Sequence, residues 1–251
     1  MNEVTGESWS PSEGLSNGDR KIFDSVLDFV RRHTPAACLL CGAGTRGAGL
    51  CDGCAADLPR AAGPACPLCA EPLPAPGVCG RCLKHRPAFD ATAAALLYRF
   101  PADVLVQRLK YGGELACANV LGELLAEAVL PLPRPDLLIP MPLHPDRLRG
   151  RGFNQAVELA RPIARRLDIE LDVSACRRLR DTPAQAGLDL SARRRNVRGA
   201  FACDAELTGR RVAIVDDVLT SGATLDALAT VLRKGGAVEV RAWVVARAPK
   251  D

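Results

Sequence analysis

The pattern of apolar and polar positions is clearest around residue 216. Residues 212–215 form an unbroken apolar run, which predicts a buried strand because it lacks helical spacing. Two carboxylates, Asp216 and Asp217, follow where the chain is expected to leave the sheet. A helix is predicted from near Gly222 to about Lys234. The chain therefore places a pair of acids between a strand and a helix.

Other segments can be assigned in the same way. The first part of the chain is a polar tail, residues 1–20, expected to be disordered, followed by an amphipathic helix over residues 21–35. Strands are predicted within residues 89–98, 135–140 and 238–245, and helices near residues 103–110, 114–129 and 153–167. Pro162 lies inside the last of these helices and is expected to kink it.

Composition limits the classes of protein to consider. The chain has 251 residues, and its 48% apolar content is ample for a core. The longest apolar stretch is too short to span a bilayer, and the polar, acidic start does not resemble an export signal, so a soluble cytoplasmic protein is expected. The net charge is +4, and 28 of the 33 basic residues are arginines. Since GC-biased coding also produces arginine, basicity alone does not predict nucleic-acid binding.

Eight of the eleven cysteines form a tandem repeat over residues 36–86, which we treat as a separate module ahead of residues 87–251. Each repeat holds two C-x-x-C pairs, and two such pairs supply the four thiolates of a structural zinc site. Two Zn²⁺ ions are therefore predicted, each bound within one repeat, the first by Cys38, Cys41, Cys51 and Cys54, the second by Cys66, Cys69, Cys79 and Cys82. Disulfides or a redox site are the alternatives. Cys117, Cys176 and Cys203 are isolated and expected to be packing residues.

A candidate phosphate site follows the acid pair. Thr220, Ser221, Gly222, Ala223 and Thr224 combine small hydroxyl side chains with a glycine at a helix start, where backbone N–H groups bind phosphate. Carboxylates just upstream suit sugar hydroxyls or Mg²⁺. The alternative is an ordinary strand-turn-helix in which Thr and Ser only cap the helix.

This segment resembles the phosphoribosyl pyrophosphate (PRPP) motif of type I phosphoribosyltransferases. The resemblance implies an α/β fold with a mostly parallel sheet and flanking helices, and binding of PRPP with Mg²⁺. It also implies roles: Asp216 and Asp217 bind the ribose 2- and 3-hydroxyls, and residues 220–224 bind the 5-phosphate, with Val218 and Leu219 before them as further substrate-binding residues. By the same resemblance, pyrophosphate binds to the loop formed by Met141, Pro142, Leu143 and His144.

Several basic residues could approach the same site. Arg147, Arg149 and Arg151 are expected on a loop, where guanidinium groups can bind phosphate or remain solvated. Lys110 could reach an anion at the site, but a solvated lysine is the preferred interpretation. The polar segment 182–198 is interpreted as an active-site lid that carries Arg193, Arg194 and Arg195.

Residues 36–248 together resemble the ComF family, on the phrases LIPMPLHPDRLRGRGFNQAVELA, RRLRDTPAQAGLDLSARRRNVRGAF and VAIVDDVLTSGATL behind the paired cysteine module. The resemblance implies a link to DNA uptake in competence and displacement at C1 of PRPP by an unidentified acceptor. Single-stranded DNA and proteins of the competence machinery are implied partners. Two alternatives stay open: a PRPP-fold protein that handles single-stranded DNA without turnover, and an amidophosphoribosyltransferase that uses ammonia, since no glutaminase-type domain is expected.

Overall fold

The computed structural model describes residues 35–46, 49–181, 197 and 199–249. The predicted tail and most of the predicted first helix lie outside these residues. The chain divides into two compact units, Met1–Cys51 and Asp52–Asp251, which are treated separately.

The described part of the first unit is a small antiparallel hairpin. Strand β1 (Pro35–Ala37) pairs with β2 (Gly44–Arg46), and the Cys38-x-x-Cys41 turn connects them. The N–H of Cys38 donates to the carbonyl of Ala43 at 2.7 Å, and Gly42 has a φ of +75°. The turn therefore folds back tightly, as expected for a knuckle that directs two sulfurs to one side.

The second unit contains a parallel five-stranded sheet in the order β3-β9-β8-β4-β5. Its strands are β3 (Ala91–Leu97), β4 (Leu137–Pro140), β5 (Glu170–Leu171), β8 (Arg211–Leu219) and β9 (Glu239–Arg247). The helices of the unit are α2 (Asp52–Ala56), α3 (Gly80–Lys84), α4 (Ala102–Gly112), α5 (Leu115–Val129), α6 (Pro145–Arg151), α7 (Gln155–Leu167) and α9 (Ala223–Lys234). The predicted parallel α/β architecture is confirmed.

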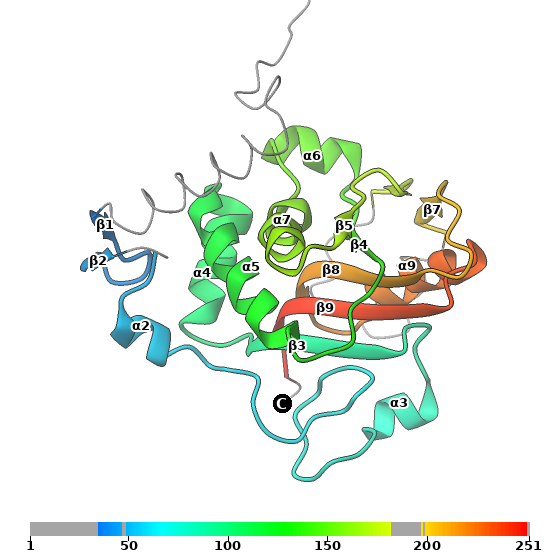
Figure 1. The fold of residues 1–251 in the computed structure, drawn as a ribbon, viewed down its shortest axis with the longest axis horizontal. Coiled ribbons are helices and arrows are strands. Elements are labelled where there is room, and N and C mark those ends of the chain that lie inside the picture. The colour runs from blue at the N-terminus through cyan, green and yellow to red at the C-terminus, as the bar shows by residue number, and fades with distance from the viewer. Residues whose placement is uncertain (1–34, 47–48, 182–196, 198, 250–251) are drawn as a thin grey trace, which may run out of the picture. The chain divides into compact units, whose positions relative to one another are not determined.

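Helices cover both faces of this sheet. Helix α5 packs on β3 and β9 and α7 packs on β4 and β8, whereas α9 contacts β9 from the other side, as Figure 1 shows. The central strand β8 is buried from Val212 to Asp217 because both faces are covered. The buried run that the sequence predicted is therefore the middle of the sheet.

The paired helices α5 and α7 approach closely at Gly122 and Pro162. A Cβ atom on Gly122 would lie 2.4 Å from Cγ of Pro162 and 2.7 Å from the carbonyl oxygen of Leu159. Pro162 lies inside α7, as predicted. Its ring occupies the space that the missing side chain of Gly122 leaves.

Two local predictions are wrong. Arg147, Arg149 and Arg151 lie on helix α6, not on a loop, because Pro145 occupies the first turn and the His144 side chain accepts a hydrogen bond from the N–H of Asp146. Strand β8 does not end before the acids; it continues to Leu219.

A second, antiparallel pair of strands lies outside the main sheet. Strands β6 (Cys176–Arg178) and β7 (Phe201–Cys203) pair with each other, and Cys176 lies opposite Cys203. The predicted lid connects them, and residues 182–196 and 198 of that segment lie outside the described residues. None of the described helices is long and apolar enough to cross a membrane.

Candidate functional site

The two acids lie side by side in β8, near its carboxyl end. Asp216 and Asp217 are both buried, and their carboxylates accept hydrogen bonds from the next N–H along the chain, those of Asp217 and Val218, at 2.9 and 2.7 Å. Both acids keep a strand conformation because β8 remains paired with β9 on either side of them. Two carboxylates are thus held within the sheet at the edge where ligands of parallel α/β folds bind.

Lys110, at the end of α4, forms an ion pair with this acid pair. Its Nζ lies 3.0 Å from Oδ2 of Asp217, and its side chain is 30% exposed. The preference for a solvated Lys110 is therefore wrong. Burial acts to lower the pKa of Lys110, but the charge and hydrogen bond of Asp217, together with the charge of Asp216, outweigh burial and hold the pKa above its usual value.

The surroundings of Asp216 disfavour ionisation of its carboxyl group. Burial, followed by repulsion from Asp217, raises the pKa of Asp216 to about 8. Apart from the ion pair with Lys110, the buried Oδ2 of Asp217 has no hydrogen-bond partner among the described residues. A buried carboxylate oxygen whose partner is a single ammonium group, beside a carboxyl group that resists ionisation, fits a site completed by a cation or by hydroxyl donors. Mg²⁺ and ribose hydroxyls meet that description.

The loop after β8 exposes backbone N–H groups. Gly222 caps α9 with a φ of +81°, which favours glycine. The carbonyls of Leu219 and Thr220 accept from Nη1 of Arg247 at 2.8 and 2.9 Å, and the carbonyl of Ser221 accepts from Nη1 of Arg81 at 3.2 Å.

In a trans peptide the carbonyl and the following N–H point in opposite directions. The N–H groups of Thr220, Ser221 and Gly222 therefore point away from the two arginines, and none of them donates a hydrogen bond to another described residue. Three free N–H groups at the start of a 12-residue helix fit a phosphate group.

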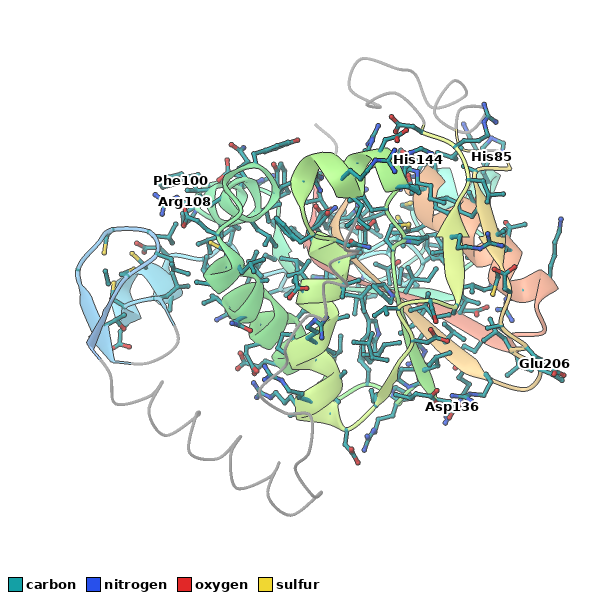
Figure 2. The ribbon with its side chains drawn as sticks, turned by 90° about the horizontal axis from the view of Figure 1, so that it is seen from above. His85, Phe100, Arg108, Asp136, His144 and Glu206 are labelled. Atoms are coloured by element: carbon teal, nitrogen blue, oxygen red, sulfur yellow. The ribbon has the colours of Figure 1, made fainter. Side chains whose placement is uncertain are left out.

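The segment predicted to bind pyrophosphate lies next to the acids. The N–H of Met141 donates to the carbonyl of Val215 at 2.8 Å, which extends the pairing of β4 and β8 to Met141, the first residue of the segment Met141, Pro142, Leu143 and His144. Figure 2 shows His144 and Asp136 at opposite ends of β4. His144 serves as the cap of α6, which fits the expectation of a hydrogen-bonding loop residue more than a general base.

The sequence interpretation missed Asn154. Its side-chain oxygen caps α7 through the N–H of Ala156 at 3.0 Å, and its Nδ2 donates to the carbonyl of Met141 at 3.1 Å. Asn154 therefore ties the start of α7 to the predicted pyrophosphate loop. The position of an Asn directly before a helix could have indicated the cap, but not the bond to Met141.

The candidate arginines are not all free to bind a ligand. Arg147 pairs with Asp181 at 2.7 Å, Arg149 pairs with Asp146, and Arg151 donates to Gln155. Arg193, Arg194 and Arg195 lie outside the described residues.

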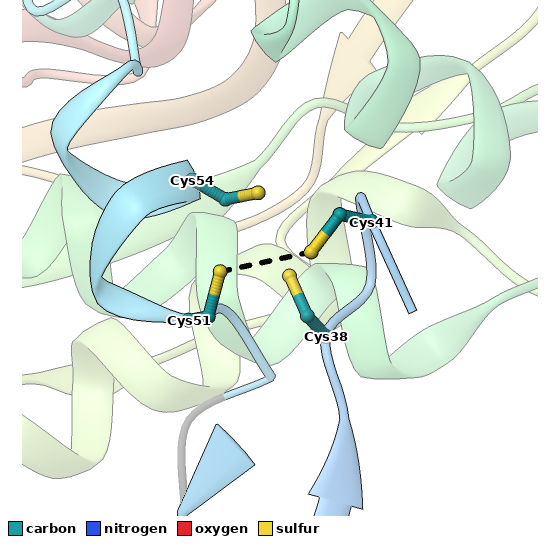
Figure 3. Close-up of side chains that lie close together, drawn as sticks. All are labelled: Cys38, Cys41, Cys51 and Cys54. Carbon is teal, nitrogen blue, oxygen red and sulfur yellow. Dashed lines mark hydrogen bonds between the residues drawn. The ribbon is translucent and has the colours of Figure 1, made fainter. Parts of the chain in front are cut away.

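The cysteines gather into two quartets, each within one repeat, as the spacing predicted. In each quartet all four sulfurs lie within 4.8 Å of one another. The first quartet, shown in Figure 3, is Cys38, Cys41, Cys51 and Cys54, and the sulfurs of Cys41 and Cys51 are 3.7 Å apart. The second quartet is Cys66, Cys69, Cys79 and Cys82, and the sulfurs of Cys69 and Cys79 are 3.6 Å apart.

These separations suit zinc. A tetrahedral ion with Zn–S bonds of about 2.3 Å holds its sulfurs about 3.8 Å apart. Burial acts to raise the pKa of Cys38, but hydrogen bonds from the backbone of Cys41, Cys51 and Leu40 lower it to about 6. The knuckle therefore favours the thiolate that a zinc ion requires. The clusters indicate structural zinc.

Comparison with known protein families agrees with this geometry. The family model "Double zinc ribbon domain" matches residues 29–83, and "Phosphoribosyl transferase domain" matches residues 154–251. Among solved structures, the chain is similar to the allosteric regulatory enzyme of purine biosynthesis, with 22% identity and a TM-score of 0.36 over 51% of this chain and 25% of that one. It is similar to a purine phosphoribosyltransferase from Pyrococcus horikoshii, with 22% identity and a TM-score of 0.32 over 50% and 68%.

Curated relatives are closer in sequence. Competence protein F of Haemophilus influenzae is 36% identical over 210 residues, which cover 80% of this chain and 91% of the relative. The DNA utilization protein YhgH of Salmonella typhi is 34% identical over 206 residues, 79% of this chain and 90% of the relative. Since both combine substantial identity with nearly full coverage of the relative, and both ribbon quartets and the parallel sheet are in place, the chain belongs to the ComF family.

Proposed function

We propose that the protein binds PRPP and Mg²⁺ at the carboxyl end of β8 and transfers the phosphoribosyl group to an acceptor. The observation that carries this proposal is the position of a buried acid pair directly before a loop whose three N–H groups have no described acceptor. A sugar phosphate needs both features at this spacing: hydroxyl acceptors for the ribose and N–H donors for its 5-phosphate.

Each group of site residues binds a different part of PRPP. Asp216 and Asp217 bind the ribose 2- and 3-hydroxyls, and the loop 220–224 binds the 5-phosphate. The segment 141–144, held by Asn154, binds the pyrophosphate. Bound Mg²⁺ supplies positive charge that offsets the charge of pyrophosphate. In the reaction the bond between C1 and the pyrophosphate oxygen breaks, and the acceptor donates an electron pair to C1.

Lys110 has a place in this scheme. Its ammonium group forms an ion pair with Asp217, so in the ligand-free site it occupies space that the ribose or the cation needs. Ligand binding must therefore displace Nζ from Oδ2 of Asp217. From the end of α4, the displaced ammonium can pair with the pyrophosphate, the most negative part of the substrate.

Titration of the full-length protein with PRPP, with and without Mg²⁺, tests the proposal by calorimetry. Replacement of both acids, Asp216→Asn with Asp217→Asn, removes two charges at nearly constant volume and should weaken PRPP binding more than tenfold. A matched control is Glu123→Gln with Glu127→Gln, which removes two exposed carboxylates from α5. Equal PRPP affinity in the two double variants would contradict the proposal.

The names of the relatives connect this family to competence and DNA utilization. We propose the same setting for this chain, in the cytoplasm, with single-stranded DNA and competence proteins as candidate partners. Transfer to ammonia is retained as one acceptor reaction to screen. A PRPP-dependent release of pyrophosphate in the presence of one amine or nucleobase, and not the others, would identify the acceptor.

A further inference from the structure

The second cysteine quartet is not a separate metal module. It lies in the same compact unit as the loop 220–224, which we call the phosphate loop, and it lies against that loop. Thr92 at the start of β3 joins the quartet segment to the sheet, since its N–H donates to Pro67 at 2.9 Å and its hydroxyl donates to Leu68 at 2.7 Å. Two arginines, one in this segment and one in β9, then connect the segment to the loop after β8.

The first contact is Arg81, which lies on α3 between the ligands Cys79 and Cys82. Its Nη1 donates to the carbonyl of Ser221 at 3.2 Å, and its side chain lines, together with Cys69, the pocket that borders Ser221 and Gly222. One planar side chain thus connects the quartet segment to the backbone of the phosphate loop.

The second contact is Arg247 at the end of β9, which is fully buried. It donates to the carbonyls of Leu219 and Thr220, and it pairs with Glu71, which lies between Cys69 and Cys79 in the same segment. Without Glu71 the buried guanidinium group would lose its carboxylate partner, and a buried unpaired charge is costly.

Together the two arginines hold three consecutive carbonyls of the loop. Because each carbonyl opposes the next N–H, they fix the direction of the N–H groups of Thr220, Ser221 and Gly222. A pocket lined by Arg81, His85, Ser221 and Gly222 lies beside the contact between Arg81 and the loop.

We propose that Arg81 is a positioning residue of the phosphate loop and that through it the second zinc ribbon forms part of the phosphate-binding site. Arg81 does not contact the substrate. It holds the Ser221 carbonyl, and thereby turns the N–H of Gly222 toward the phosphate. This inference rests on the proposed PRPP site, but the orientation of the loop can be measured without any ligand.

The test compares Arg81→Met with Lys84→Met in the full-length, zinc-loaded protein. Both variants remove one positive charge from α3, but Lys84 is exposed and forms no hydrogen bond with the loop 219–224, so it controls for charge and helix propensity. Zinc content is measured first. Hydrogen exchange of the amides of residues 219–224 is then measured without ligand, and PRPP affinity with Mg²⁺ by calorimetry.

We expect Arg81→Met to keep its zinc, to exchange the loop amides faster than the wild type, and to bind PRPP about tenfold more weakly, the size of one lost charged hydrogen bond. Lys84→Met should match the wild type in all three. Wild-type exchange rates and PRPP affinity in Arg81→Met would overturn the proposal.

Two possible results require a further variant or measurement. If Arg81→Met loses zinc, Arg81→Lys decides, since it keeps a positive charge beside Cys69 but has a single donor group in place of the planar guanidinium group. Faster loop exchange at full zinc content is expected there, and unchanged exchange would overturn the proposal. If the wild type does not bind PRPP, the proposed function fails, while the exchange rates still decide the role of Arg81.

Discussion

At the scale of single residues, the site is a small cluster of coupled charges. Asp216 and Asp217 are adjacent in one strand, both are buried, and only Lys110 forms an ion pair with them among the described residues. Burial, and then repulsion from Asp217 that one ammonium group does not fully offset, raise the pKa of Asp216 to about 8. A divalent cation or ribose hydroxyls would relieve this imbalance.

The raised pKa of Asp216 predicts a pH-dependent stability. The folded protein holds this proton up to about pH 8, whereas an unfolded chain releases it near the ordinary value for Asp, about 4. Folding is therefore favoured most below about pH 4 and loses this contribution as pH rises to 8, by at most about 1.4 kcal/mol per pH unit. Chemical unfolding of the ligand-free protein between pH 5 and 8 measures the slope. The slope should be absent in Asp216→Asn.

The same proton predicts a pH-dependent affinity. In the proposed function PRPP with Mg²⁺ binds to the ionised pair, so its affinity should rise with pH up to about 8, by at most about tenfold per unit. The phosphate groups of PRPP also titrate, so Asp216→Asn serves as the reference for that part of the change. Parallel pH profiles for the wild type and Asp216→Asn would contradict the assignment.

Lys110 gives a separate prediction. Lys110→Met keeps the apolar stem of the side chain and removes the ammonium group, so the repulsion between the acids grows and Asp216 holds its proton more strongly. If Lys110 also pairs with pyrophosphate, PRPP affinity should fall about tenfold at pH 8, where both acids can ionise. Ribose 5-phosphate, which lacks the pyrophosphate, should lose less affinity. An equal loss for both ligands would limit Lys110 to a role at the acids.

At the scale of elements, apolar periodicity predicted the strands and helices that bury a face. Helix α6 was missed because its sequence, PDRLRGR, contains one apolar side chain and buries no residue; it forms through its caps, His144 and Gly152. Strand β8 extends past the acids because β9 continues to pair with it, which depends on a partner segment more than twenty residues away. Contacts such as Lys110 with Asp217 and Arg81 with Ser221 join residues more than a hundred positions apart, and no pattern within either segment encodes them.

The contact of α5 with α7 predicts a destabilising substitution. Gly122→Ala would place a Cβ atom 2.4 Å from Pro162 and 2.7 Å from the Leu159 carbonyl, so the two helices must separate. We expect the free energy of unfolding to fall by about 1–3 kcal/mol. Gly150→Ala, also in a helix but with no atom within 4 Å of the added Cβ, is the control and should be neutral or stabilising. Equal stability of the two variants in denaturant unfolding would contradict the close contact.

At the scale of the whole molecule, the two quartets predict a metal content. Elemental analysis of the reduced full-length protein should find about two zinc ions per chain, because each quartet provides four sulfurs at the separation that a tetrahedral ion needs. Cys69→Ser together with Cys82→Ser should lower the content to about one. A wild-type value of one would assign one quartet another role, and a value of zero would favour a redox function.

The proposed ligand is PRPP, whereas the names of the relatives refer to DNA, so the question for the whole molecule is whether both bind at one site. Single-stranded DNA is a polyanion, and the buried acids of β8 repel it, whereas the surplus of basic over acidic residues in the chain, 33 against 29, can attract its phosphates elsewhere. We therefore expect an oligonucleotide and PRPP to bind without competition. The double variant Asp216→Asn with Asp217→Asn should lose PRPP binding and keep its oligonucleotide affinity, with an unchanged dependence of log K on log salt. Fluorescence anisotropy of a labelled oligonucleotide, titrated at several salt concentrations with and without saturating PRPP and Mg²⁺, measures both. Displacement of the oligonucleotide by PRPP would place the two anions in one site and would favour a DNA-handling role for the acid pair and its loop.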